Sequence, residues 1–91
     1  GCNIENAAYG PTNCAERTAF FKAVYDGHRD FKAIAICGGK EGKITGAFPP
    51  CGVCRQVMRE FCQEDFKVYM ITPDGYEERT LADLLPDSFS L

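Results

Sequence analysis

The chain has 91 residues, 45% of them hydrophobic, which is typical of one small globular domain. It has no apolar run of the roughly 18 residues that a membrane span needs, and residues 1–6 lack the apolar stretch of a signal peptide, so we expect a cytoplasmic protein. The net charge of −3, with basic residues scattered among more numerous acids, argues against nucleic-acid binding and favours a small neutral or weakly charged substrate.

The first third of the chain predicts a loop followed by a helix. Residues 2–13 are polar and contain the chain-breaking pair Gly10-Pro11. Asn13 is the expected N-cap of a helix that runs to about Asp26 and stops at Gly27. A buried face is predicted by small and apolar residues at helical spacing: Ala15, Ala19, Phe20, Ala23 and Val24.

The middle third predicts a strand and a second helix. Residues 33–37 are an unbroken apolar run before two glycines, which predicts a fully buried strand. An exposed loop over 40–43 and an extended segment over 44–48 follow. The helix should begin near Pro50, because proline is favoured at the first helical position. One of its faces is apolar: Val53, Cys54, Val57, Met58, Phe61 and Cys62.

The last third predicts a hairpin and a short helix. Residues 67–72 form a second strand, Pro73-Asp74-Gly75 a turn, and residues 76–80 an antiparallel edge strand. Thr80 caps a helix over 81–85, with Asp83 at the capping-box position. No repeat or linker interrupts this order, so residues 1–91 are predicted to form a single α/β domain.

Two segments, Cys14-Ala15-Glu16 and Pro50-Cys51-Gly52-Val53-Cys54, carry the chemistry. Three thiols can hold a zinc ion and leave one position open for water, as catalytic zinc sites do. Glu16 then reaches that water without binding the metal. Two other interpretations of the six cysteines are a disulfide framework and a redox pair of Cys51 with Cys54. Cys2, Cys37 and Cys62 are simplest as buried small apolar residues.

The charged neighbours of these cysteines have alternative roles. Asn13 and Glu16 have nearly the spacing of a capping box, in which Glu16 would only tie down the helix start. Three thiolates around Zn²⁺ leave a net charge of −1, and Arg17 and Arg55 could each offset it by donating to a sulfur. Both arginines could instead be solvated.

These motifs, together with residues 1–9 and the ending Leu84-Leu85-Pro86 with Phe89, resemble cytidine deaminase of the small homotetrameric, three-cysteine type. The resemblance implies a three-layer α/β/α fold whose mixed sheet carries helices with the zinc ligands at their N-termini. It implies hydrolytic deamination of free cytidine and deoxycytidine in pyrimidine salvage. A related blasticidin-S-type deaminase and a non-catalytic zinc module that serves oligomerisation are the alternatives.

The resemblance also implies a role for each site residue. Cys14, Cys51 and Cys54 would bind zinc and Glu16 would move protons, while Arg17 offsets the third thiolate. The substrate-binding residues would be Asn3 and Glu5 at the ribose, Ala15 at the base carbonyl, and Ala7, Tyr9 and Phe89 at a neighbouring subunit's site, giving a tetramer with composite active sites. The family has a helix and two strands before the equivalent of Gly1, so we expect part of a longer native chain and an open sheet edge.

Overall fold

The structure is a computed structural model that describes all 91 residues. Its elements in chain order are α1 (Ala15–Tyr25), β1 (Ala33–Ile36), β2 (Gly39–Lys40), β3 (Lys43–Ile44), α2 (Gly52–Phe61), β4 (Lys67–Thr72), β5 (Gly75–Thr80) and α3 (Leu81–Leu84). Every predicted helix and strand is present. The structure adds the small β2–β3 hairpin where the sequence indicates a loop, because Glu41 and Gly42 both take the positive φ angles of a tight hairpin turn. No helix is both long enough and apolar enough to cross a membrane.

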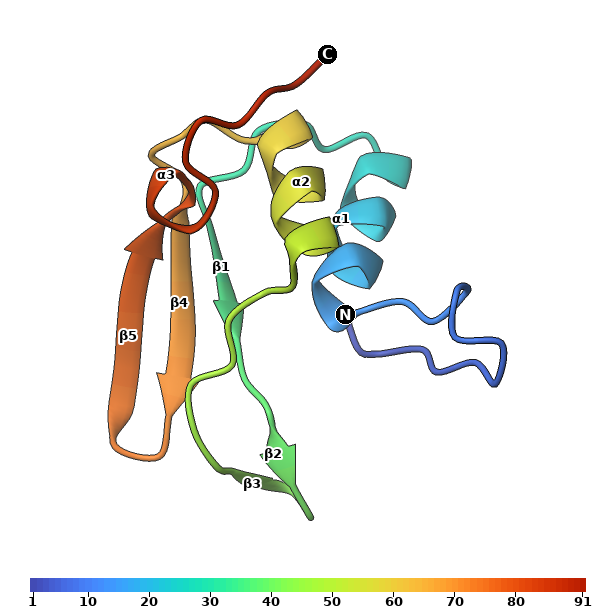
Figure 1. Cartoon of the computed structure of the whole chain (residues 1–91), viewed down its shortest axis with the longest axis vertical. Coiled ribbons are helices and arrows are strands. Elements are labelled where there is room, and N and C mark those ends of the chain that lie inside the picture. The colour runs from blue at the N-terminus through green and yellow to red at the C-terminus, as the bar shows by residue number, and fades with distance from the viewer.

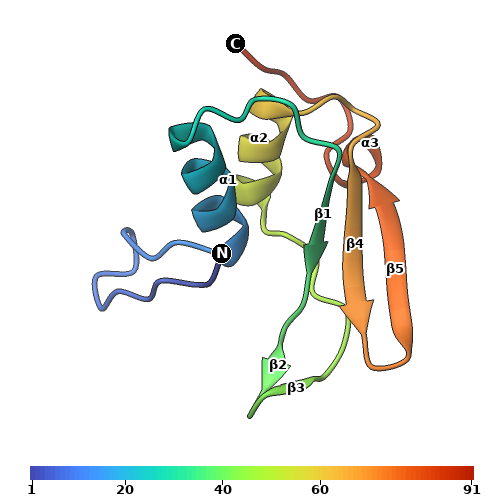
Figure 2. The ribbon, with the colours of Figure 1, turned by 180° about the vertical axis from the view of Figure 1, so that it is seen from behind.

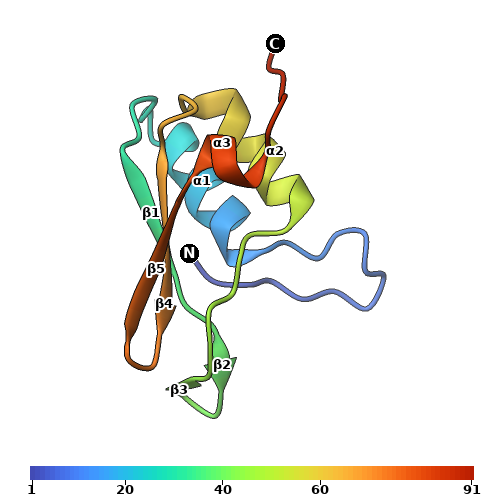
Figure 3. The same cartoon turned by 60° about the vertical axis from the view of Figure 1, so that its left-hand side comes forward.

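The main sheet has three strands in the order β1-β4-β5. β1 runs parallel to β4, which pairs antiparallel with β5 through a turn of Pro73 and Asp74, as predicted. Helices α1 and α2 lie side by side on one face of this sheet and begin at the same end of the molecule (Figure 1). A view from the side shows all three helices on that face (Figure 3). The α/β class and the mixed sheet are therefore confirmed.

The core lies between the helices and the sheet. Val68 and Met70, two residues apart on β4, turn the same side toward Phe20 of α1 and Met58 of α2. The full cluster is Phe20, Ile36, Cys54, Met58, Cys62, Phe66, Val68, Met70 and Leu81. The predicted apolar face of α2 is only partly buried. Cys54, Met58 and Cys62 are buried, whereas Val53 is 57% exposed.

The prediction of a fully buried strand at residues 33–37 is wrong for this chain. Only Ile36 is buried, while Ala33, Ala35 and Cys37 are exposed. β1 has a single neighbour, β4, so one of its edges is open, and all three helices lie on one face of the sheet. Residues 1–91 thus contribute two of the three expected layers, with β1 at an open edge as expected.

Two predicted helix starts are displaced by one residue or more. α1 begins at Ala15 with Cys14 as its N-cap, not Asn13, because Asn13 pairs in a β-bridge with Ile4 and makes two backbone hydrogen bonds of 2.9 Å to it. In the same way Cys51 caps α2, and Pro50 precedes the cap. The predicted capping box of Thr80 and Asp83 at α3 is confirmed.

The two ends of the chain lie at opposite ends of the helix pair. The Ile4–Asn13 bridge closes the first segment into a loop that extends away from the body beside the start of α1 (Figure 2). The C-terminal tail emerges near the other end of α2. The helix starts, where both capping cysteines lie, are therefore close to residues 3–13 and far from the final residue.

Candidate metal centre

Three cysteine sulfurs meet where α1 and α2 begin. Cys14 and Cys51 occupy the N-cap positions of the two helices, and Cys54 lies in the first turn of α2. The Sγ atoms of Cys14 and Cys51 are 3.8 Å apart, and those of Cys51 and Cys54 are 3.5 Å apart. All three sulfurs lie within 4.8 Å of one another. The structure thus brings together the three residues predicted as metal ligands, although 37 positions separate the first two.

This spacing suits a zinc ion. With Zn–S bonds of about 2.3 Å, a tetrahedral site has sulfur–sulfur edges of about 3.8 Å, which matches the separations of 3.8 and 3.5 Å. A disulfide bond requires a separation of about 2.05 Å. All six cysteines are free thiols, which does not support a disulfide framework. The donor set therefore has the chemistry and the spacing of a three-thiolate zinc site.

The environment acts differently on the two thiols of α2. Burial by itself would raise the pKa of Cys51, but the backbone N–H and thiol of Cys54, the Cys14 thiol and the N–H of Val53 together lower it below 9.0. Burial, followed by the hydrogen bond with Cys51, raises the pKa of Cys54 to about 12. Metal binding at neutral pH must therefore displace a proton from Cys54, since thiols coordinate as thiolates.

Arg17 is placed against the sulfurs, not in solvent. Its Nη2 donates to the Cys14 Sγ at 3.3 Å. Hydrogen bonds to the thiols of Cys14 and then Cys54 raise the pKa of the Arg17 guanidinium. Its Nε is buried and has no hydrogen-bond acceptor. A fixed positive charge beside three thiolates offsets the surplus negative charge that would otherwise remain around a divalent ion.

Arg55 does not donate to a sulfur, and that alternative is wrong. Its Nε donates to the carbonyl oxygen of Pro50, and its Nη1 to the carbonyl oxygen of Leu84, each at 2.7 Å. Both arginines lie one helical turn past a cysteine, Arg17 after Cys14 and Arg55 after Cys51. The carbonyl oxygens of Pro50 and Leu84 lie within reach of Arg55 and accept its hydrogen bonds instead of a sulfur.

Glu16 is not a helix cap. Because α1 begins at Ala15, Glu16 is its second residue, whereas a capping box requires the third. No side-chain hydrogen bond caps this helix. The side chain is half-buried, and its charge contributes to the raised pKa of Cys54, which places the carboxylate near the sulfurs. Glu16 also lines a cavity of about 140 Å³ between α1 and β1.

The structure pairs the two polar residues assigned to the ribose. The Asn3 Nδ2 donates to the Glu5 Oε1 at 3.3 Å. Both flank Ile4, whose bridge to Asn13 brings this segment next to Cys14. Ala15, the first residue of α1, lines the same cavity as Glu16. Gly1 also lines it, a residue that the sequence did not single out. A Cβ there would lie 2.5 Å from the Ala15 carbonyl oxygen, so only glycine fits.

The three residues expected at a neighbouring subunit are all exposed. Tyr9 is 84% exposed at the tip of the N-terminal loop, which also carries Ala7. Phe89 is 75% exposed in the C-terminal tail, which is fixed to α2 by a 2.9 Å hydrogen bond from the Gln56 Nε2 to the Phe89 carbonyl oxygen. Within one chain none of these residues lines the cavity beside Glu16.

The remaining cysteines are not all buried. Cys62 is 5% exposed, as predicted, and burial raises its pKa to about 12. The prediction is wrong for Cys2 and Cys37, which are both exposed. Cys2 belongs to the N-terminal loop segment, and Cys37 follows the last residue of the open-edged strand β1. Neither position packs against the core.

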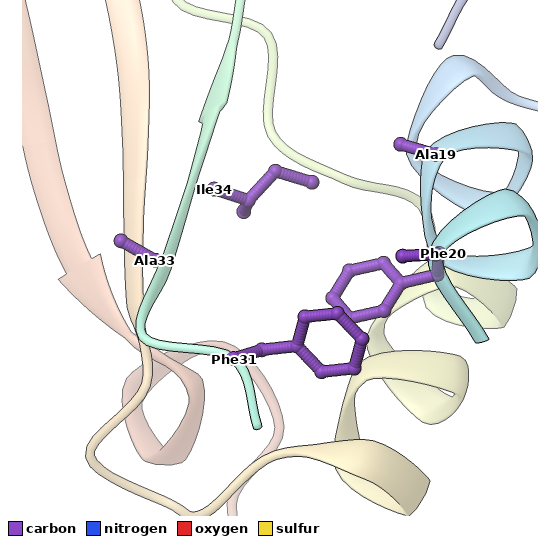
Figure 4. A pocket seen from close by; sticks show the side chains of 6 residues that line it. Ala19, Phe20, Phe31, Ala33 and Ile34 are labelled. Carbon is purple, nitrogen blue, oxygen red and sulfur yellow. The ribbon is translucent and has the colours of Figure 1, made fainter. Parts of the chain in front are cut away.

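A second cavity of about 190 Å³ lies between α1 and β1 (Figure 4). Its lining is entirely apolar: Ala19, Phe20, Ala23, Phe31, Ala33 and Ile34. Two of the three alanines predicted to form a buried helix face, Ala19 and Ala23, line it, and both are only half-buried. With no titratable or polar side chain in its lining, this cavity has no group that could act on a substrate.

Comparisons with known proteins agree with the cysteine cluster. Residues 1–70 match the family model for the cytidine and deoxycytidylate deaminase zinc-binding region. The chain is 57% identical to cytidine deaminase of Sporosarcina psychrophila and 52% identical to that of Halalkalibacterium halodurans, in each case over 91 residues and 99% of this chain. It spans 64% and 66% of the length of these two relatives.

Solved structures give the same picture of the fold. The crystal structure of cytidine deaminase from Burkholderia pseudomallei matches with a TM-score of 0.85 and 44% identity, covering 98% of this chain and 69% of that one. The structure of cytidine deaminase from Mycobacterium tuberculosis matches with a TM-score of 0.75 and 37% identity, covering 100% of this chain and 68% of that one.

Proposed function

The chain belongs to the family defined by the cytidine and deoxycytidylate deaminase zinc-binding region, and on that premise we propose that it catalyses the hydrolytic deamination of free cytidine and deoxycytidine. The products are uridine or deoxyuridine and ammonia, and the reaction belongs to cytoplasmic pyrimidine salvage. The observation that carries the proposal is the cluster of three sulfurs with 3.8 and 3.5 Å separations and a carboxylate, Glu16, near Cys54.

Cys14, Cys51 and Cys54 would hold the zinc ion. When bound, zinc supplies Lewis-acid activation of a water molecule at the position that three protein ligands leave open. Arg17 offsets negative charge at the site through its 3.3 Å hydrogen bond to Cys14. The positive ends of α1 and α2 both lie at this point and would stabilise the negative charge of three thiolates that hold the metal.

Glu16 would move the protons. Its carboxylate would take one proton from the attacking water and deliver it to N3 of the cytosine ring as the C4–O bond forms. It would then take the remaining proton from the C4 hydroxyl and donate it to the amine, so that the C4–N bond breaks, ammonia leaves and the C4 carbonyl forms. Freedom from any cap hydrogen bond at the start of α1 supports this role, because the carboxylate oxygens remain available. Position two of the helix also keeps Glu16 within one turn of the Cys14 cap.

Asn3 and Glu5 would bind the ribose hydroxyls, for which an amide donor and a carboxylate acceptor 3.3 Å apart are suited. The Ala15 backbone N–H would bind the base carbonyl, as an unpaired donor in the first turn of a helix. The cavity beside Glu16, at about 140 Å³, is smaller than the roughly 300 Å³ at which ligand pockets begin. A neighbouring subunit would therefore complete the site with Ala7, Tyr9 and Phe89 in a homotetramer.

Ammonia release from the zinc-loaded protein tests the proposal. Cytidine, deoxycytidine, blasticidin S and a single-stranded oligonucleotide serve as parallel substrates. We expect turnover of the first two only. Preference for blasticidin S would replace the substrate class, and zinc binding without ammonia release from any substrate would identify a non-catalytic zinc module that serves oligomerisation.

A further inference from the structure

Arg55 joins the turn before Cys51 to the C-terminal part of the chain. Its guanidinium donates through Nε to the carbonyl oxygen of Pro50 and through Nη1 to that of Leu84, both at 2.7 Å. The two acceptors belong to segments 34 residues apart in sequence, the approach to α2 and the end of α3. Hydrogen bonds from a charged donor at this distance are strong and directional.

The Pro50 carbonyl belongs to the peptide unit that leads directly into Cys51. Holding that oxygen fixes the plane of the Pro50–Cys51 peptide, and so fixes the direction in which the Cys51 side chain leaves the backbone. The Pro50 side chain is itself less than 2% exposed, so the turn is packed as well as hydrogen-bonded. Backbone geometry that presents a ligand before metal arrives lowers the cost of metal binding.

The cation of Arg55 has no acidic partner. The four salt bridges of the chain involve Lys22, Arg59, Lys67 and Arg79. A half-buried guanidinium that is held only by two carbonyl oxygens forms a clamp between backbone segments. Lysine would not replace it, because an ammonium is a compact point charge without the planar fork that reaches two separated acceptors.

We propose that Arg55 is a positioning residue that clamps the Pro50–Cys51 turn to the end of α3 and thereby holds Cys51 in place as a metal ligand. The inference rests on the proposed zinc centre. It concerns how firmly the chain retains the metal, and it does not require that the protein be an enzyme. Residues that orient a metal ligand without binding the metal typically change metal affinity by about 10–100-fold when they are replaced.

The test is the rate at which zinc-loaded protein loses zinc to a coloured chelator, compared for the parent, Arg55→Gln, Arg55→Lys and Arg59→Gln. Arg59 lies one turn further along α2 and donates to the Ser88 Oγ at 2.9 Å, so Arg59→Gln removes a link to the C-terminal tail without touching Pro50. We expect zinc loss at least about tenfold faster for Arg55→Gln, faster also for Arg55→Lys, and unchanged for Arg59→Gln.

Cobalt substitution adds a readout of the ligand itself. In Co²⁺-loaded protein the sulfur-to-cobalt charge-transfer absorption should fall in both Arg55 variants if Cys51 is held less firmly. A parent rate for Arg55→Lys would mean that charge alone suffices and would overturn the clamp. Equal acceleration by Arg59→Gln would overturn it too. If Arg55→Gln is isolated unfolded, Arg55→Lys decides the question. A parent protein that binds no zinc overturns both the zinc centre and this inference.

Discussion

Replacing Glu16 with glutamine separates chemistry from stability at the candidate site. The change keeps the size of the side chain but removes its ability to carry a proton. Because α1 has no side-chain cap and Glu16 is its second residue, no cap hydrogen bond is lost. We therefore expect Glu16→Gln to fold, to keep its zinc and to bind cytidine through Asn3 and Glu5, yet to lose nearly all turnover.

The expected magnitudes of the two effects differ. An acidic side chain in the first turn of a helix contributes about 0.3–1 kcal/mol through the helix dipole. Repulsion between Glu16 and the Cys54 thiolate acts in the opposite direction, so the net loss of stability should stay below about 1 kcal/mol. A general acid–base supplies about 10²–10⁴-fold in rate, which is about 2.7–5.4 kcal/mol of transition-state stabilisation at 1.36 kcal/mol per factor of ten.

The assay is ammonia release from cytidine, with zinc content and melting temperature measured on the same preparation. Thr80→Ala is the matched control, because it removes the hydrogen bond that caps α3, from the Asp83 N–H to the Thr80 Oγ1, and changes no residue of the candidate site. It should cost about 0.5–2 kcal/mol, or several degrees of melting temperature in a domain of this size, and leave kcat unchanged. The reasoning is refuted if Glu16→Gln behaves like Thr80→Ala, melting several degrees lower but working within tenfold of the parent.

Three further predictions concern the metal, the assembly and the buried thiol. Purified protein should hold one zinc per chain. Cys51→Ala or Cys54→Ala should lose the zinc and unfold more easily, since metal binding contributes directly to folding free energy. If metal analysis finds no zinc and mass spectrometry finds a Cys51–Cys54 disulfide, the redox alternative is favoured. Light scattering should detect a homotetramer, in which Phe89→Ala raises KM without releasing zinc; a fully active monomer contradicts this. Burial in the folded chain raises the pKa of the Cys62 thiol from 9.0 to about 12. The unfolded chain therefore loses this proton at a lower pH, and the free energy of unfolding falls as pH rises from about 9 to 12. When the free energy of unfolding is measured by urea titration at several pH values, its fall with pH should be smaller in Cys62→Ala. An unchanged slope against pH would exclude the effect.

Local patterns in the sequence determined most of the elements and the ligand set. Thr80 and Asp83 specify a capping box through their spacing alone, and Pro73 with Asp74 forms the predicted turn between β4 and β5. The three cysteines carry a chemical signature that does not depend on knowing the fold. Such features depend on residues close in sequence or on ligand chemistry, which a linear pattern contains.

Tertiary structure alone decided the contacts between distant segments. Asn13 has the chemistry of a cap, but pairing with Ile4 shifts the role to Cys14, which removes the capping box from Glu16. Arg17 and Arg55 hold similar positions beside the motifs, yet one reaches a sulfur and the other two carbonyl oxygens, because the acceptor on Leu84 arrives from the far end of the chain.

Burial of β1 was also outside the reach of local patterns. The apolar run at residues 33–37 predicts two covered faces, but exposure depends on how many strands and helices pack beside it. In this chain β1 has one neighbour and one covered face, so Ala33, Ala35 and Cys37 remain exposed. The hydrophobicity of a residue indicates how much apolar surface it could bury. Whether that surface is buried depends on which other elements pack against it.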